Sequence, residues 1–82
     1  MYEVRLEKPA KRFLKKINRE DQKRIIKKLR ALEENPELGK PLTGKLAGLW
    51  SLRFGKFRAL YQIKNKALLI FVLDIGHRKN IY

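Results

Sequence analysis

The stretch from Trp50 to Tyr61, WSLRFGKFRALY, decides the fold because it predicts two short strands joined by a tight turn at Gly55-Lys56. A glycine at the first loop position suits a two-residue type II′ hairpin, and such a turn fixes the register of the strands. The register forms one apolar face from the pairs Phe54–Phe57, Leu52–Ala59 and Trp50–Tyr61. Because strand side chains alternate between faces, Arg53 lies directly opposite Arg58 on the other face.

The Arg53–Arg58 pair has two interpretations. Like charges that face each other across a hairpin are destabilising, so the fold gains little from this pair. A bound polyanion would gain from both guanidinium groups, because each can hold a phosphate with two hydrogen bonds. The alternative is two solvated arginines on an open sheet face, which is the commoner situation for a surface arginine. The pair alone favours neither interpretation.

Composition limits the classes of protein to which the chain can belong. The 82 residues are expected to form one domain, residues 1–82. The chain has no cysteine, and His77 is its single histidine, so neither a disulfide framework nor an ordinary zinc site is expected. No metal or other cofactor is expected. No apolar run reaches the length of a membrane span and no signal peptide is recognised, so we expect a cytoplasmic protein without a membrane partner.

The charge of the chain indicates the chemistry of its partners. Lys and Arg number 21 against 8 Asp and Glu, which gives a formal net charge of +13. With 44% hydrophobic residues this is a folded basic domain and not a disordered tail. A sequence pI near 10.4 points to nucleic acid, an acidic protein, or both.

Periodicity outside the hairpin predicts the remaining elements. Residues 2–7 alternate with period two, as in a strand. Residues 8–17 and 19–34 carry apolar stripes with helical spacing, the second formed by Ile25, Ile26, Leu29 and Leu32. Residues 36–49 have the Pro and Gly content of a loop. Strand 57–64 leads through a tight turn at Asn65-Lys66 to an apolar strand, 67–73, and a polar tail, 74–82.

These elements predict an α+β two-layer sandwich in the order β-α-α-β-β-β. A helical hairpin should pack on one face of a mostly antiparallel, four-stranded sheet. The first strand is expected beside strand 67–73, which would then have neighbours on both sides.

The side chains that could carry chemistry cluster at one end of this sheet. Ser51 has no acid or histidine near it in sequence, so a nucleophilic triad is unsupported. The remaining candidates are Arg53, Arg58, His77, Arg78, Lys79 and Tyr82. The end of the last strand should lie beside the start of strand 57–64, which places His77 and Arg78 near Arg58.

This set of side chains would suit metal-free RNA cleavage, in which the 2′-hydroxyl attacks its own phosphorus. Arginine cannot act as a base at ordinary pH, so the base would be His77, Tyr82 or a solvent-assisted group. The alternative is that His77 is a surface residue without a role, that Tyr82 only packs its ring, and that Arg78 and Lys79 are a solvated charge cluster.

The chain resembles the RelE/ParE superfamily of toxins over nearly its whole length. The segments that carry the resemblance are PLTGKL at 41–46, GLWSLR at 48–53, FRALY at 57–61 and IGHRKNIY at 75–82. The resemblance implies that Arg58 holds the scissile phosphate, that Arg78 helps the leaving group, and that Tyr82 lies near the attacking hydroxyl. Arg53 stands where RelE has a catalytic lysine, and His77 where a basic residue or histidine is usual.

Ser51 departs from the family pattern, because RelE has another lysine at this position. The residues expected to contact RNA are Lys45, Arg53, Lys56, Arg58 and Lys79.

The RelE branch cuts mRNA in the ribosomal A site, so the resemblance implies a ribosome-dependent mRNA endonuclease that inhibits translation. The alternatives are a ParE-like inhibitor of DNA gyrase, which is not a nuclease, and an inactive member that only binds its antitoxin. An acidic, RelB-like antitoxin is implied as partner, with a heterotetramer as a possible assembly.

Overall fold

The structure, a computed structural model, describes residues 1–79. Over these residues the elements, in chain order, are β1 (Glu3–Leu6), α1 (Lys8–Lys16), α2 (Arg19–Glu34), the 3₁₀ turn η1 (Pro36–Leu38), β2 (Lys40–Pro41), the 3₁₀ turn η2 (Gly44–Leu46), β3 (Trp50–Phe54), β4 (Phe57–Lys64), the 3₁₀ turn η3 (Asn65–Ala67) and β5 (Leu69–His77). The predicted α+β fold is confirmed, and helices 8–17 and 19–34 are found within a residue of their predicted ends.

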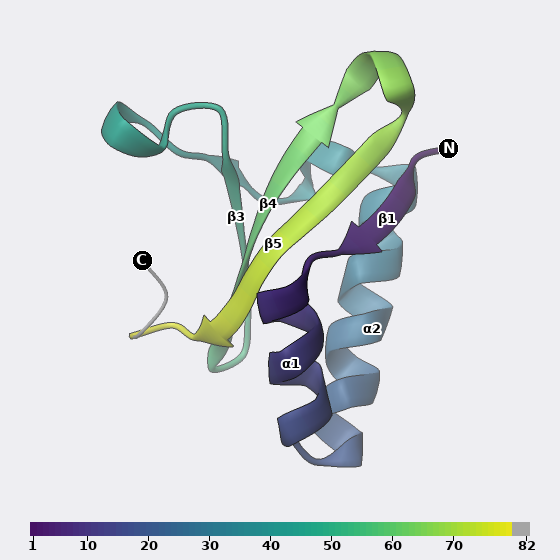
Figure 1. Cartoon of the computed structure of the whole chain (residues 1–82), viewed down its shortest axis with the longest axis vertical. Helices are drawn as coiled ribbons and strands as arrows, with labels where there is room; N and C mark the ends of the chain where they lie inside the picture. The colour runs from purple at the N-terminus through teal and green to yellow at the C-terminus, as the bar shows by residue number, and fades with distance from the viewer. Residues whose placement is uncertain (80–82) are drawn as a thin grey trace.

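The strands described within residues 1–79 form a five-stranded sheet in the order β1-β5-β4-β3-β2 (Figure 1). Neighbouring strands pair antiparallel except β1, which runs parallel to β5. The first strand therefore lies beside the long apolar strand, as predicted, and β5 has neighbours on both sides. The parallel pair requires a crossover, and α1 and α2 lie within it.

The β3–β4 hairpin has the predicted register. Arg53 pairs with Arg58, Phe54 with Phe57 and Trp50 with Tyr61. Gly55 has a φ of +59°, while Lys56 does not have a positive φ. This combination is that of a type II′ turn, in which the first loop residue alone needs the left-handed region.

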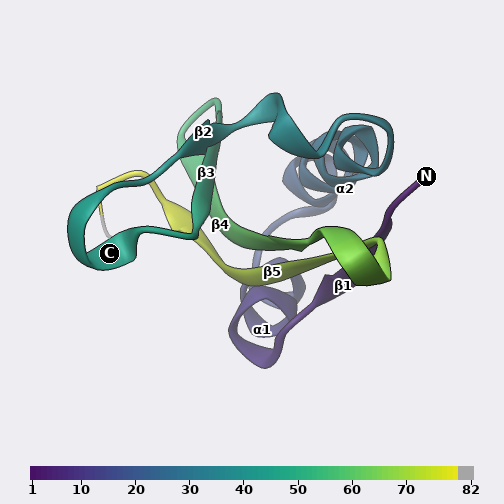
Figure 2. The same cartoon turned by 90° about the horizontal axis from the view of Figure 1, so that it is seen from above.

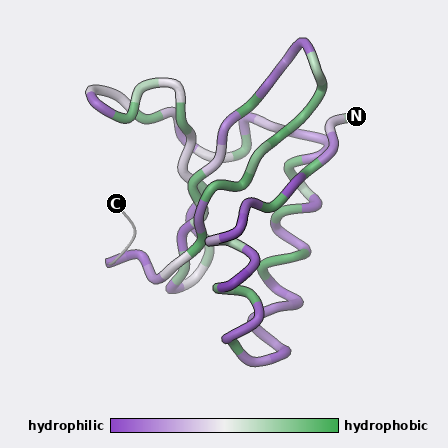
Figure 3. Tube along the Cα trace, viewed as in Figure 1, coloured by the Kyte–Doolittle hydropathy of each residue, from purple (hydrophilic) through white to green (hydrophobic). Residues whose placement is uncertain are grey.

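The helices cover the sheet face that carries Leu52, Phe57, Ala59 and Tyr61 (Figures 1 and 2). The core joins these residues to the buried side chains of the helices and of β5, which are Ala10, Leu14, Ile25, Leu29, Leu32, Ile70, Val72 and Ile75. Figure 3 shows β5 as a long hydrophobic stretch, while the helices alternate along their length between hydrophilic and hydrophobic residues.

Helix α2 begins where its sequence predicts and buries three of the four residues of its apolar stripe. The Asn18 side chain accepts a hydrogen bond from the Asp21 amide at 2.9 Å, which caps the first turn. Ile25, Leu29 and Leu32 are buried, but Ile26 is 44% exposed. Ile26 belongs to the apolar stripe but lies at its exposed edge, because it is rotated about 100° from Ile25 on the helix.

The expected four-stranded sheet has a fifth strand, β2, in a segment predicted to be a loop. Lys40 pairs with Ser51 and Pro41 with Trp50. A two-residue strand has no periodicity that could reveal it, and proline is tolerated there because the strand lies at the edge. Gly39 allows the approach, since a Cβ at this position would lie 2.5 Å from the Ser51 carbonyl oxygen.

The last strand also differs from the prediction. Strand β5 begins at Leu69 and extends to His77, so residues 74–77 are part of the sheet and not of a polar tail. They form a strand because Phe57–Leu60 of β4 supplies their backbone partners. A bulge at Leu60/Tyr61 shifts the register, since Leu60 pairs with Asp74 and Tyr61 with Val72. The turn before β5 is η3, and Leu68 follows it with a φ of 55°.

The Tyr61 hydroxyl connects the core to the segment after α2. It donates a hydrogen bond to the Pro36 carbonyl at 2.7 Å and accepts one from the Gly39 amide at 3.0 Å. The Tyr61 side chain is fully buried. Burial raises the pKa of this phenol above its ordinary value, and the Gly39 hydrogen bond acts in the opposite direction.

We expect Tyr61→Phe to destabilise the protein at neutral pH by about 1–3 kcal/mol, because the part-buried Pro36 carbonyl and Gly39 amide lose their partner. The raised pKa of Tyr61 means that its neutral form is favoured in the folded state. Its contribution is fully present below about pH 10, the ordinary tyrosine pKa, and is lost as the pH rises through the folded-state value.

Urea unfolding of the wild type and Tyr61→Phe between pH 7 and pH 11 measures this difference. The gap in unfolding free energy should narrow above about pH 10. Tyr2→Phe, which removes a hydroxyl that makes a solvent-exposed hydrogen bond to Asn65 Oδ1 at 2.6 Å, is the control. A gap that stays constant across this range contradicts the assignment.

Candidate functional site

A cationic cavity of about 300 Å³ lies beside the β3–β4 hairpin, on the face turned away from the helices. Its polar walls are Lys40 from β2, Ser51 and Arg53 from β3, and Arg58 from β4. Cross-strand partners share a face, and Lys40 pairs with Ser51 as Arg53 pairs with Arg58. These four side chains therefore come from one face of three adjacent strands.

The arginines in this cavity differ in exposure. Arg53 is exposed and Arg58 is half-buried. Two guanidinium groups at cross-strand partner positions can hold a phosphate through charge-assisted hydrogen bonds. The cavity thus has the charge and donor chemistry of an oxyanion site.

Ser51 is the buried polar side chain of this cavity. It is 7% exposed, and within residues 1–79 its hydroxyl oxygen has no hydrogen-bond partner. An unsatisfied buried hydroxyl costs stability and calls for an explanation.

A second cavity, of about 590 Å³, lies at the hairpin turn and the end of β5. Gly55, Lys56, His77, Arg78 and Lys79 line it. The Arg78 amide donates to the Lys56 carbonyl at 3.0 Å, and the Arg78 guanidinium donates to the Gly55 carbonyl at 3.3 Å. These bonds hold Arg78 against the turn.

The His77 side chain lies on the opposite face from Arg58. Its ring contacts Phe13 and Phe57, with centroid distances of 5.9 and 5.4 Å. The predicted pairing of the strands is confirmed, because Phe57 pairs with His77 and Arg58 with Gly76. The expectation that His77 lies near Arg58 holds for the backbone but not for the imidazole, since neighbouring positions on β4 face opposite sides.

The other predicted site residues are spread more widely. Lys45 is exposed on η2, in a loop that projects from the sheet (Figures 1 and 2), and it lines neither cavity. The Lys56 ammonium lies 3.9 Å from an Asp21 carboxylate oxygen and 5.5 Å from the centre of the Phe57 ring. Tyr82 lies outside the described residues. Lys40 had no signal in the sequence, because its strand was predicted to be a loop.

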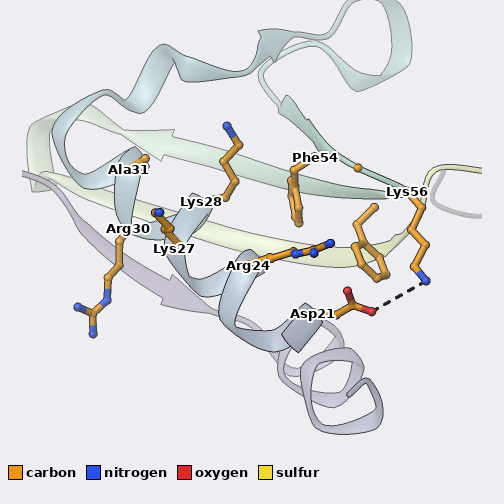
Figure 4. A pocket seen from close by; sticks show the side chains of 10 residues that line it. Asp21, Arg24, Lys27, Lys28, Arg30, Ala31, Phe54 and Lys56 are labelled. Carbon is orange, nitrogen blue, oxygen red and sulfur yellow. Dashed lines mark ion pairs between the residues drawn. The ribbon is translucent and has the colours of Figure 1, made fainter. Parts of the chain in front are cut away.

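A groove of about 890 Å³ separates α2 from the hairpin tip on the helix side of the sheet (Figure 4). Its apolar lining comes from Ala31, Phe54 and Phe57, and its basic rim is Arg24, Lys27, Lys28, Arg30 and Lys56. Figure 4 shows the Lys56–Asp21 ion pair joining the hairpin turn to the start of α2.

Residues 1–79 contain no group of three or more His, Asp or Glu side chains placed to hold a metal ion. Neither α1 nor α2, the α-helices of this range, is long and apolar enough to cross a membrane.

Comparison with known proteins identifies the family. Residues 4–82 match the family described as "ParE toxin of type II toxin-antitoxin system, parDE". The chain belongs to the RelE/ParE superfamily of toxins.

Relatives of this RelE/ParE toxin include Toxin RelG of Mycobacterium tuberculosis, which is 42% identical over 45 residues. That match covers 55% of this chain and 52% of RelG, so it spans about half the length of that relative. A chain in the crystal structure of the M. tuberculosis RelBE2 toxin–antitoxin complex superposes with a TM-score of 0.87 and 33% identity, over 94% of this chain and 98% of that one. The intact E. coli RelBE complex contains the same fold, with a TM-score of 0.80 and 18% identity over 94% and 96% of the two chains.

Arg53→Gln tests whether the facing arginines serve an anion. Removing one charge relieves repulsion, so we expect the melting temperature to stay the same or rise slightly. Binding to a single-stranded RNA oligonucleotide should weaken, and its dependence on log salt should become shallower by about 0.7. Thermal unfolding and a salt-dependent titration measure both.

Arg12→Gln, at an exposed position of α1, is the matched control for this charge change. A clear fall in melting temperature with unaltered RNA binding would favour the interpretation of Arg53 as a solvated structural residue.

Proposed function

We propose that this toxin is a RelE-like mRNA endonuclease that acts on the ribosome in the cytoplasm. The observation that carries the proposal is the cavity in which Arg53 and Arg58 face each other beside Lys40 and Ser51. A like-charged pair in such a cavity is better explained by a polyanionic ligand than by stability. The sequence identity to the toxin of RelBE2 over nearly the whole chain supports the RelE branch.

The proposed reaction is transfer of the phosphoryl group to the neighbouring hydroxyl. The 2′-oxygen forms a bond to phosphorus, the bond from phosphorus to the 5′-oxygen breaks, and the products are a 2′,3′-cyclic phosphate and a 5′-hydroxyl. A base removes the 2′ proton and an acid protonates the leaving oxygen. Arg58 would stabilise the charge on the pentavalent phosphorane, because a fixed cation acts most strongly where charge develops.

We propose the residues for proton transfer from their chemical type. Arginine is not a base, and the His77 ring packs against Phe13 and Phe57. We therefore assign proton transfer to Tyr82 or to a group of the ribosome–mRNA complex. Arg78, held at the hairpin turn, is the candidate to neutralise the leaving group.

The alternative is a ParE-like inhibitor of DNA gyrase. It is favoured by the description of the matched family, which names ParE. An inactive member that only binds its antitoxin is a further alternative. The functions differ in their target, so one pair of assays separates them.

Arg58→Ala should lower mRNA cleavage in a translating extract by about 10²–10³-fold, because it removes the charge that faces the reacting phosphate. Primer extension on a defined mRNA measures the cuts, and Arg12→Ala, on exposed α1, should leave them unchanged. Circular dichroism checks the fold, since Arg58 is half-buried. Intact mRNA together with gyrase-dependent DNA breaks contradicts the proposal in favour of the ParE alternative.

We also propose that a cognate acidic antitoxin binds the groove between α2 and the hairpin tip. The groove combines an apolar lining with five basic side chains on its rim. An amphipathic helix with one apolar stripe and acidic flanks would match both features. The protein related by sequence in RelBE2 is part of a toxin–antitoxin complex, which supports a partner of this class.

Charge reversal at Lys27 and Lys28 tests the antitoxin site. Lys27→Glu/Lys28→Glu should weaken binding to the coexpressed antitoxin by about tenfold, mainly through slower association. Lys64→Glu/Lys66→Glu carries the same charge change at the far end of the sheet and is the control. Equal affinity of both double variants, measured by biolayer interferometry, would contradict the groove as the docking site.

A further inference from the structure

We infer that Lys40 and Ser51 are substrate-contacting residues of the same cavity and that they complete a phosphate site with Arg53 and Arg58. The inference rests on the proposed function for the identity of the ligand, an RNA phosphodiester. Ser51 would donate its hydroxyl hydrogen to a nonbridging phosphate oxygen, while Lys40 would supply an ammonium group from the neighbouring strand.

Ser51 supports the inference by its burial. Its side chain is 7% exposed and lines the cavity, and within the described chain its hydroxyl has no hydrogen-bond partner. Such a group weakens the fold, and an alanine would occupy the same space without the penalty. The hydroxyl oxygen itself exposes less than 1 Å², so the side chain would turn toward the cavity to donate to a phosphate oxygen, and this contact would explain a serine there.

Lys40 supports the inference by its register. It is the cross-strand partner of Ser51, so both side chains leave the sheet on the same face as Arg53 and Arg58. Lys40 is exposed on the edge strand β2 and lines the cavity. Three cations thus border one buried hydroxyl, in a site whose remaining lining is Leu38, Gly39, Leu42 and Leu52.

The site is built by contacts made for other reasons. Gly39 lets the chain approach β3, since a Cβ at this position would lie 2.5 Å from the Ser51 carbonyl oxygen. The Gly39 amide is held at 3.0 Å from the Tyr61 hydroxyl. The core therefore fixes the backbone that presents Lys40, which gives the cavity the rigidity that a binding site needs.

The test uses the full chain and a 2′-O-methyl RNA trinucleotide, which cannot be cleaved by its own 2′-oxygen. Backbone amide shifts of the isotope-labelled protein report where the trinucleotide binds and how tightly. We expect shifts at residues 39–41, 51–53 and 58, and about tenfold weaker binding for Lys40→Gln and for Ser51→Ala. Lys66→Gln, on exposed η3, should bind as the wild type does.

Two signatures separate contact with the phosphate from a structural role. Lys40→Gln should make the salt dependence shallower by about 0.7, because one cation is lost, whereas Ser51→Ala should leave the slope unchanged. Ser51→Ala should also keep or raise the melting temperature while it weakens binding. Lys40→Arg should restore most of the affinity.

Three results would overturn the inference. They are wild-type affinity in both variants, amide shifts confined to residues 77–79, and no binding of the trinucleotide at millimolar concentration. Primer extension in a translating extract keeps its failure distinct from that of the proposed function. If the wild type cuts mRNA and both variants cut equally well, the inference fails alone. If the trinucleotide requires Lys40 and Ser51 but mRNA stays intact, the phosphate site stands and the endonuclease proposal fails.

Discussion

The rest of the structure depends on the register that the Gly55-Lys56 turn imposes on β3 and β4. The left-handed φ of +59° at Gly55 allows the two-residue turn, and the alternation of strand side chains then sorts the hairpin into two faces. Leu52, Ala59 and Tyr61 face the helices and form the middle of the core. Ser51, Arg53 and Arg58 face the other side, where they line the cationic cavity.

This alternation places two different surfaces back to back on one strand. Phe54 lines the groove beside α2, while its neighbour Arg53 lines the cationic cavity on the opposite face. A partner helix in the groove and a nucleic acid in the cavity would therefore contact the same strand from two sides. The chain carries more positive charge than its own carboxylates can neutralise, because it has 21 Lys and Arg residues but only 8 Asp and Glu residues. Partners that carry negative charge relieve this excess on both faces.

Much of the fold was predictable because its signals are local. The helix boundaries follow from the apolar spacing within residues 8–17 and 19–34, and the Asn18 side chain caps the start of α2. The hairpin register follows from two loop residues. The hypothesis that Arg53 and Arg58 bind an anion began from this register, and both side chains line one cavity.

What the sequence by itself determined is thus the order of the helices and of the four longer strands, the apolar faces and the arginine pair, since each depends on residues close in the chain. The tertiary structure alone decided that Lys40 lies opposite Ser51, because a two-residue edge strand has no pattern and exists only by pairing with β3. It also decided the direction of His77. The bulge at Leu60/Tyr61 puts Val72 and Ile75 on the same face despite their odd spacing, so the His77 ring joins Phe57 in place of Arg58. Pairing between distant segments sets both outcomes, and such pairing is a property of the assembled sheet and not of any local stretch.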